Sequence, residues 1–368
     1  MDKRLVGKWY KEEMGETLNI FDESPLRIKM SFTSSGYYNF EPNCIYEKDD
    51  FLCFEINDEE YRMVYHIKYV DGNIEGYYTQ FGKEIPVKYN LVSEKPEDEE
   101  YRCLFIEKYV PNTNIKRIDI LKKYASYDRT QSVPPYSTEY VLGGEIPPIL
   151  EKYKFSEYIA GEDKSSDDIV FKTLDFVCDH FGHNGNSDFP SERKIEDIVE
   201  YCENNDGKIN CRGLAILLAS ILRLLGIKAR HITCMPYENP SWERHVVVDC
   251  LLPSGKRIML DPTWRLYLKD ADGKYLSLEQ LRVLLIKEQP FFINDGASYN
   301  GADFDKEYHR NYMIKNTFRF SRGTYYNNGT DDYALRRIEL VPANYHTENF
   351  SDSAKKEFVY NDAEFWTM

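Results

Sequence analysis

One helix-like segment constrains this chain more than any other part of it. Residues 208–226 read KINCRGLAILLASILRLLG, where Asn210 and Cys211 precede an almost unbroken apolar run that stops at Gly226. Asparagine is a favoured N-cap residue and glycine a favoured residue just beyond a helix end, so the pattern predicts a helix that begins at Cys211. Because such a helix is apolar on nearly all sides, it must be buried at the centre of a domain.

The cysteine occupies a position that stabilises a thiolate. In the first turn of a helix the backbone N–H groups have no partner within the helix, and the helix dipole is positive there. Both effects favour the ionised form of a thiol. A structural cysteine would more naturally lie inside the helix, so we predict that Cys211 is a nucleophile if the fold brings it suitable partners.

The hairpin predicted downstream supplies two such partners. In ERHVVVDCLLPSGKRIMLDPTW, two strands flank a three-residue turn that ends at Gly255. A loop of this kind pairs Asp261 with Val247, which lies two residues from His245 on the same face of the sheet. A two-residue loop would place His245 and Asp261 on opposite faces, so this prediction depends on the glycine.

A cysteine, a histidine and an aspartate in this order are the parts of a thiol triad. The Cys211 thiolate would attack an acyl carbon, and His245 would take the thiol proton and later give it to the leaving amine. Asp261 would orient the imidazole and stabilise its cation. The backbone N–H of Cys211 would donate to the developing oxyanion.

Two quoted segments together resemble the core of the transglutaminase-like superfamily. NCRGLAILLASILRLLGIKAR is followed by RHVVVDCLLPSGKRIMLDPTW, and the family core likewise has a cysteine at a helix start, LGI-x-AR, a histidine on a strand and DPT closing the next strand. The resemblance implies a papain-like α+β fold with Cys211 as nucleophile, His245 as base and Asp261 as orienting acid. It also implies that the chemistry needs no metal.

The sequence departs from the family pattern upstream of the cysteine. Family enzymes often use a tryptophan or glutamine there as the second oxyanion donor, whereas the only upstream tryptophan here is Trp9. His183, Asn184 or Asn186 would take that role instead. Trp264, directly after DPT, is expected to pack near the triad.

No metal site or cofactor is predicted. Cys178, His180 and His183 in CDHFGH are potential metal ligands. Three such residues on one segment are usually accidental, however, and no fourth ligand is evident.

The first ninety residues follow a different pattern. Short β-branched and aromatic runs, such as YRMVYHIKYV at 61–70, are separated by Gly, Asp, Asn and Pro. About eight such runs predict an antiparallel sheet that closes into a small barrel. The opening Gly7-x-Trp9 resembles the signature of lipocalin/calycin barrels, which implies a cup for an apolar ligand. A barrel filled by its own tyrosines is the alternative, and it is favoured because an eight-stranded barrel has room for little beyond side chains.

These patterns predict an α+β protein in three parts. We expect a lipocalin-like antiparallel β-barrel at residues 1–95 and a connecting segment at 96–150. A papain/transglutaminase-like α+β domain would follow at 151–368 and end in an aromatic-rich tail. The oligomeric state does not follow from these patterns.

Charge and hydropathy limit the partners. A net charge of −15 opposes binding to nucleic acid. No segment has the roughly 20 apolar residues that cross a bilayer, so no membrane partner is expected. The N-terminal MDKRLVGKWYKEE lacks the apolar run of a signal peptide, which predicts a cytoplasmic location where the eight cysteines stay reduced.

We therefore expect a cysteine-dependent acyl-transfer enzyme that acts on a peptide or protein substrate. Hydrolysis of an amide or peptide bond is favoured over crosslinking. A peptide:N-glycanase activity ranks lower, because the accessory zinc-binding cysteine pairs of those enzymes are missing. A different class stays open, namely a catalytically silent scaffold whose barrel binds a peptide or an apolar ligand.

Overall fold

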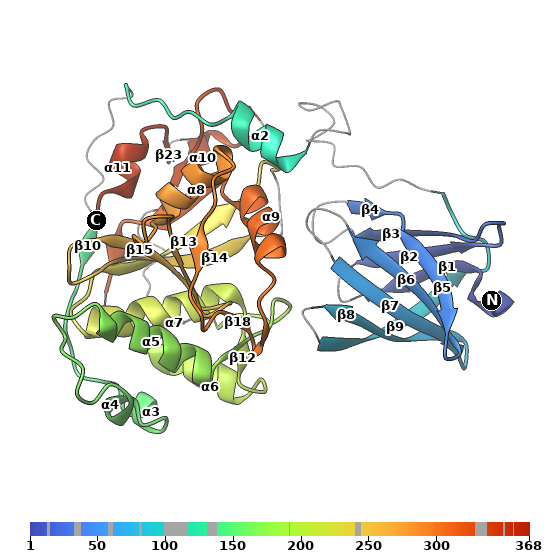
Figure 1. Cartoon of the computed structure of the whole chain (residues 1–368), viewed down its shortest axis with the longest axis horizontal. Helices are drawn as coiled ribbons and strands as arrows, with labels where there is room; N and C mark the ends of the chain where they lie inside the picture. Colours follow the sequence, from blue (N-terminus) through green and yellow to red (C-terminus); the bar gives the residue numbers. More distant parts are fainter. Residues whose placement is uncertain are drawn as a thin grey trace. The chain divides into compact units, whose positions relative to one another are not determined.

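The computed structural model describes residues 1–12, 15–32, 38–57, 62–80, 83–98, 116–130, 138–190, 192–239, 244–327, 337–348, 350–355 and 357–368. The chain divides into two compact units (Figure 1). The first comprises Met1–Ile115, Glu238–Glu243 and Asp305–Met313, and the second comprises Lys116–Tyr237, Arg244–Phe304 and Ile314–Met368.

The connecting segment expected at 96–150 lies partly outside the described residues, which omit 99–115 and 131–137. The domain boundaries expected near residues 95 and 150 stay predictions.

The first unit is built on an antiparallel sheet. Within the described residues it has nine strands in the order β4-β3-β2-β1-β9-β8-β7-β6-β5. Their bounds are β1 (Gly7–Lys11), β2 (Glu16–Phe21), β3 (Arg27–Phe32), β4 (Tyr38–Phe40), β5 (Cys44–Lys48), β6 (Phe51–Asn57), β7 (Arg62–Val70), β8 (Asn73–Gln80) and β9 (Lys83–Ser93).

This sheet curls around one apolar face, as Figure 1 shows. Trp9 is fully buried on that face, and its Nε1–H donates to the carbonyl oxygen of Leu5 at 2.8 Å. Tyr65 and Tyr89 are also fully buried and both donate to the carboxylate of Glu16. The predicted antiparallel, barrel-like N-terminal domain is confirmed. Complete closure is not observed in the described residues, because β4 and β5 are the two edge strands of the sheet.

One strand of this sheet was not predicted. β2 reads ETLNIF, and every one of its residues is buried, although half of them are polar. Glu16 is buried by the two tyrosines named above, and the side chain of Asn19 accepts a hydrogen bond from the backbone of Glu97 at 2.9 Å. The partners that make these polar residues compatible with burial are far away in the sequence, so no local pattern marks the strand.

The second unit is built on a mixed sheet covered by helices. Its described strands run in the order β17-β16-β15-β14-β13-β20-β22-β23. Their bounds are β13 (Ala229–Met235), β14 (His245–Leu251), β15 (Arg257–Asp261), β16 (Leu266–Lys269), β17 (Phe292–Ile293), β20 (Arg319–Gly323), β22 (Arg337–Leu340) and β23 (Phe358–Val359). The aromatic-rich tail therefore supplies three strands of the sheet.

Helix α7 (Cys211–Leu224) lies at the centre of this unit and contacts β13 and β14. Helices α5 (Asp168–His180) and α6 (Ile195–Glu203) pack against α7, and Figure 1 shows the three helices together on one side of the sheet. The predicted helix start is confirmed, since Asn210 is the N-cap and its side chain accepts from the Gly213 N–H at 3.1 Å. Gly226 follows the helix at a φ of +89°, as a left-handed residue should.

The remaining described elements are short, apart from two helices of the second half of the chain. They are η1 (Lys3–Leu5), α2 (Arg117–Lys123), β10 (Glu139–Tyr140), α3 (Pro148–Glu151), α4 (Phe155–Tyr158), β11 (Gly182–His183), β12 (Lys208–Ile209), α8 (Leu278–Ile286), β18 (Ser298–Tyr299), β19 (Ala302–Asp303), α9 (Lys306–Asn316), β21 (Tyr325–Tyr326), α10 (Asp352–Lys355) and α11 (Asp362–Trp366). In the described part of the chain no helix is long and apolar enough to cross a membrane.

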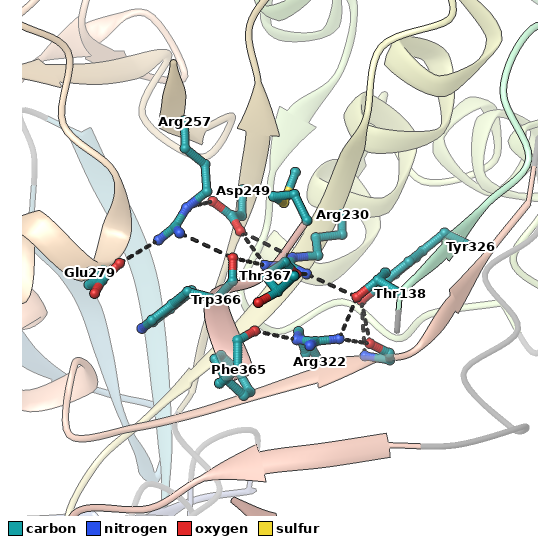
Figure 2. A network of polar contacts seen from close by, with 12 residues as sticks. Thr138, Arg230, Asp249, Arg257, Glu279, Arg322, Tyr326, Phe365, Trp366 and Thr367 are labelled. Carbon is teal, nitrogen blue, oxygen red and sulfur yellow. Dashed lines mark hydrogen bonds and ion pairs between the residues drawn. The ribbon is translucent and has the colours of Figure 1, made fainter. Parts of the chain in front are cut away.

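Three arginines of this sheet donate hydrogen bonds to backbone carbonyls near the end of the chain. Figure 2 shows Arg230, Arg257 and Arg322 around the carbonyl oxygens at the end of α11. Arg322 donates to the carbonyl of Phe365 at 2.8 Å, and Arg257 donates to that of Trp366 at 3.1 Å. Because the last carbonyls of a helix have no partner within it and carry partial negative charge, cations are well suited to bind them.

Removing the N-cap of α7 is expected to destabilise the helix that carries Cys211. Asn210→Ala should lower the free energy of unfolding by about 0.5–2 kcal/mol, because the Gly213 N–H loses its acceptor. Urea unfolding followed by far-UV circular dichroism measures this change. Asn210→Ser is the matched control, since it keeps a capping oxygen, and equal losses in both variants would contradict the capping role.

Candidate active site

The predicted hairpin register brings His245 and Asp261 together. β14 pairs with β15 so that Val248 faces Leu260 and Leu251 faces Arg257, which is the expected register. Gly255 in the turn has a φ of +83°, as a left-handed residue requires. At the other end of the hairpin, Nε2 of His245 lies 2.6 Å from Oδ2 of Asp261. Both side chains are almost completely buried, so this hydrogen bond is shielded from water.

The aspartate is itself fixed by the turn that follows it. Its Oδ1 accepts from the Thr263 N–H at 3.0 Å, and its backbone carbonyl accepts from the Trp264 N–H at 3.2 Å. The Trp264 ring packs beside the His245 imidazole, with 4.9 Å between the ring centroids. The packing expected for Trp264 near the triad is thus observed, and it holds the imidazole from the side.

The thiol of Cys211 lies beside two histidines. Burial raises the pKa of this thiol, but hydrogen bonds from His183 and His245 and the charges of these side chains outweigh it and lower the pKa to about 5. For His245, burial lowers the pKa, while the charge and hydrogen bond of Asp261, followed by those of Cys211, raise it to about 10. Each partner therefore favours the charged form of the other, which is the thiolate of Cys211 and the imidazolium of His245.

The two ring nitrogens of His245 have separate partners. Nε2 is bound to Asp261, so Nδ1 is the nitrogen left for the hydrogen bond between His245 and the Cys211 thiol. An imidazole held in this way can exchange a proton with the Cys211 sulfur through Nδ1, while the Asp261 carboxylate stabilises the imidazolium.

His183 reaches the sulfur from a different part of the chain. It lies on β11, which runs parallel to β12 so that His183 faces Ile209, two residues before Cys211. Nδ1 of His183 is 3.0 Å from the hydroxyl of Tyr299. Its backbone is clamped by the side chain of Asn300, which accepts from the His183 N–H at 2.7 Å and donates to the His183 carbonyl at 2.9 Å.

Asn184 and Asn186, the two asparagines considered for the same role, are both exposed. The side-chain Oδ1 of Asn184 accepts from the Asn186 N–H at 3.1 Å within their own turn. Among the residues considered as a second donor, His183 forms a side-chain hydrogen bond with the Cys211 thiol. Tyr299 and Asn300, which fix it, were not predicted, because they lie far along the chain in a two-residue strand and its turn, with no motif around them.

The other cysteines near this site are protonated thiols. Cys178 on α5 donates to the carbonyl of Pro262 at 3.3 Å, and burial raises its pKa. Cys234 on β13 faces His245 in the ladder, and burial, followed by the charges of Asp261 and Cys211, raises its pKa well above the usual value. Of these three cysteines, Cys211 is the one whose pKa is lowered, which favours the thiolate form.

The possible metal ligands of CDHFGH do not converge. Cys178 points to Pro262, His180 packs against the rings of Tyr153 and Phe176, and His183 faces Cys211. Across the described ranges of the chain, no group of three or more His, Cys, Asp or Glu side chains is arranged to hold a metal ion.

Comparison with known proteins identifies the domain that holds these residues. The family model of the transglutaminase-like superfamily matches residues 153–262. This region is a transglutaminase-like domain. It includes Cys211, His245 and Asp261, whose order and elements are those implied by the sequence resemblance. No curated protein matches the chain.

Solved structures with low similarity were also found. The periplasmic domain of TgpA from Pseudomonas aeruginosa has 13% identity and a TM-score of 0.26, over 71% of this chain and 76% of that chain. A second structure of that domain, bound to ethylmercury, has 13% identity and a TM-score of 0.22 over the same shares. A putative protease from Parabacteroides distasonis has 14% identity and a TM-score of 0.24, over 57% of this chain and 40% of that chain.

The cytoplasmic location expected from the sequence does not stand, and the two TgpA structures are both of a periplasmic domain. The expectation rested on the absence of an apolar run in the first residues, which does not determine a compartment. The seven described cysteines are free thiols in the structure.

Proposed function

We propose that this chain is a cysteine-dependent acyl-transfer enzyme that hydrolyses an amide or peptide bond. The observation that carries the proposal is the position of His245 between the Cys211 sulfur and Asp261, with the pKa of Cys211 lowered to about 5. A buried structural cysteine would instead have a raised pKa, as Cys234 and Cys250 do.

Acylation begins with the thiolate. The Cys211 sulfur forms a bond to the carbonyl carbon, and the π electron pair of the carbonyl moves onto its oxygen. The N–H of Cys211, in the first turn of α7, donates to this oxyanion. When the carbonyl re-forms, the C–N bond breaks, and the amine leaves with the proton that His245 held.

Deacylation returns the enzyme to its starting state. His245, now neutral, takes a proton from a water molecule as the water oxygen bonds to the thioester carbon. Collapse of the second tetrahedral intermediate breaks the C–S bond and releases the carboxylic acid. The thiolate and the imidazolium are thereby restored, with Asp261 stabilising the cation throughout.

We propose a peptide or protein as the acyl donor and water as the acceptor. Water reaches an acyl-enzyme without a dedicated binding site, whereas an amine acceptor needs one. Hydrolysis is therefore the outcome that requires the fewest features beyond the triad.

The proposal is tested with a mixed peptide library in the presence of putrescine, analysed by mass spectrometry. We expect new termini or side-chain carboxylates, without incorporated putrescine, and loss of these products in Cys211→Ala. Cys44→Ala removes an exposed cysteine of the first unit and is the matched control, which should retain activity. Products that persist in Cys211→Ala would refute the nucleophile, and incorporated putrescine would refute hydrolysis as the main reaction.

A further inference from the structure

The Cys211 sulfur is contacted by two histidines that have different second partners. His245 is bound through Nε2 to the carboxylate of Asp261, whereas His183 is bound through Nδ1 to the hydroxyl of Tyr299. A carboxylate stabilises a protonated imidazole because it carries the opposite charge, and a neutral phenol does not. The two imidazoles are therefore suited to different tasks.

The phenol of Tyr299 keeps its proton at neutral pH. Burial raises the pKa of Tyr299 to about 12, and the charge of the nearby Cys211 thiolate adds to this effect. A protonated hydroxyl can donate to Nδ1 of His183, and an imidazole that accepts at Nδ1 carries its proton on Nε2, as the imidazolium also does. Because Nδ1 is bound to Tyr299, Nε2 is the nitrogen left for the hydrogen bond to Cys211, and it is an N–H donor.

The position of this donor is set by the backbone on both sides. β11 is paired with β12, which runs directly into Cys211, and Asn300 clamps the peptide groups of His183. Space is also tight at the preceding residue, where a Cβ on Gly182 would lie 3.1 Å from the Lys208 side chain and 3.2 Å from that of Asn300. An N–H held in this way needs no reorganisation when charge develops near it.

We propose that His183 is the second oxyanion donor of this site and that Tyr299 is the residue that positions it. This inference rests on the proposed acyl transfer. In the resting site the Nε2–H of His183 donates to the thiolate. When the sulfur bonds to the carbonyl carbon, the negative charge moves from the sulfur to the carbonyl oxygen, and the same donor follows the charge to that oxygen. No proton is transferred to or from His183 in this step.

This is the role that family enzymes often assign to a tryptophan or glutamine upstream of the cysteine, and the only upstream tryptophan here is Trp9. The backbone N–H of Cys211 supplies one donor from the helix, and His183 supplies the other from β11. Two donors that converge on one oxygen stabilise the intermediate more than one, and removing one such donor typically costs about 10²–10³-fold in rate.

Two reactions of the same sulfur separate this role from a simple effect on the thiolate. Alkylation by iodoacetamide needs the thiolate but forms no oxyanion, whereas acylation by p-nitrophenyl acetate needs both. Rates are measured at pH 7 on the full chain, from the Cys211 peptide for alkylation and from the Cys211-dependent burst of p-nitrophenolate for acylation. The ratio of the acylation rate to the alkylation rate reports the oxyanion donor.

We expect His183→Ala to lower this ratio about 100-fold and His183→Gln to lower it less, because a glutamine amide can still donate. Tyr299→Phe should lower it by a smaller factor with little change in alkylation. Asn184→Ala is the matched control and should leave the ratio unchanged. If the ratio is equal in His183→Ala and wild type, His183 is not an oxyanion donor, whatever the change in either single rate.

The outcome for the proposed function is read separately. If wild-type Cys211 reacts with both reagents no faster than an ordinary thiol, and His245→Ala changes nothing, the acyl-transfer proposal fails and the inference about His183 fails with it. If wild-type Cys211 reacts fast with both reagents and the ratio of acylation to alkylation is the same in His183→Ala, only the inference about His183 is overturned.

Discussion

The Asp261→Asn variant is expected to keep its fold and to lose about 10⁴-fold of its acyl-transfer rate. An asparagine amide can replace the carboxylate in shape, but it cannot stabilise the His245 cation, and an amide N–H aimed at Nε2 forces the imidazole proton onto Nδ1. The nitrogen that faces Cys211 then cannot act as a base. The burst of p-nitrophenolate from p-nitrophenyl acetate at pH 7 measures this loss.

The acyl-transfer rate of Asp261→Asn should also depend on pH in a definite direction. Asp261 contributes to the raised pKa of His245, and the paired imidazolium contributes to the lowered pKa of Cys211. Without the carboxylate, the pKa of His245 falls and that of Cys211 rises, so the variant should recover part of its rate as the pH increases. Asp272→Asn, an exposed aspartate in a turn, is the control. An unchanged rate in Asp261→Asn would contradict the triad.

The second large effect is expected at Asp249, which lies in the polar network of Figure 2. Its Oδ2 accepts from Nε and Nη2 of Arg230 at 3.1 and 2.9 Å, and its Oδ1 lies 3.0 Å from Nε of Arg257. The side chains of Arg230 and Asp249 are both fully buried. Two arginines that also bind the end of α11 therefore share one buried counter-ion.

Asp249→Ala should lower the free energy of unfolding of the second unit by about 3–5 kcal/mol. The reason is that removing one partner of a buried pair leaves the Arg230 charge buried and uncompensated, while the carbonyl groups it binds cannot neutralise it. Urea unfolding followed through labelling of Cys202, a buried cysteine of α6, reports the second unit.

The matched control for this change is Asp175→Ala. Asp175 forms an ion pair with Arg265 at 2.7 Å, but both side chains are partly exposed. Its loss should cost no more than about 1 kcal/mol, because water screens exposed pairs. A cost of similar size for Asp249→Ala and Asp175→Ala would show that burial of the Arg230 pair has no energetic consequence.

The core of the candidate site could be predicted because it is encoded locally. The N-cap at Asn210 and the three-residue turn ending at Gly255 each depend on a few adjacent residues, and together they place Cys211 at a helix start and His245 beside Asp261. A hairpin register follows from its turn, so the diagonal contact of the histidine and the aspartate needed no knowledge of the rest of the fold.

The features that could not be predicted depend on contacts between distant segments. Strand β2 contains buried polar residues whose hydrogen-bond partners lie on β7, on β9 and in the chain that follows β9. The arrangement of Tyr299 and Asn300 around His183 joins residues more than a hundred positions apart. The strands of the C-terminal tail likewise join the sheet through neighbours that no short pattern specifies.

The central claim is that His245 holds Cys211 as a thiolate, and the pH dependence of iodoacetamide alkylation at Cys211 tests it most directly. In the wild type the rate should rise through a midpoint near pH 5 and stay high at neutral pH, in keeping with a pKa of about 5. In His245→Ala the midpoint should move up toward that of an ordinary thiol, near pH 8.5. A slow reaction at pH 6–7 with the same midpoint in both proteins would contradict the claim.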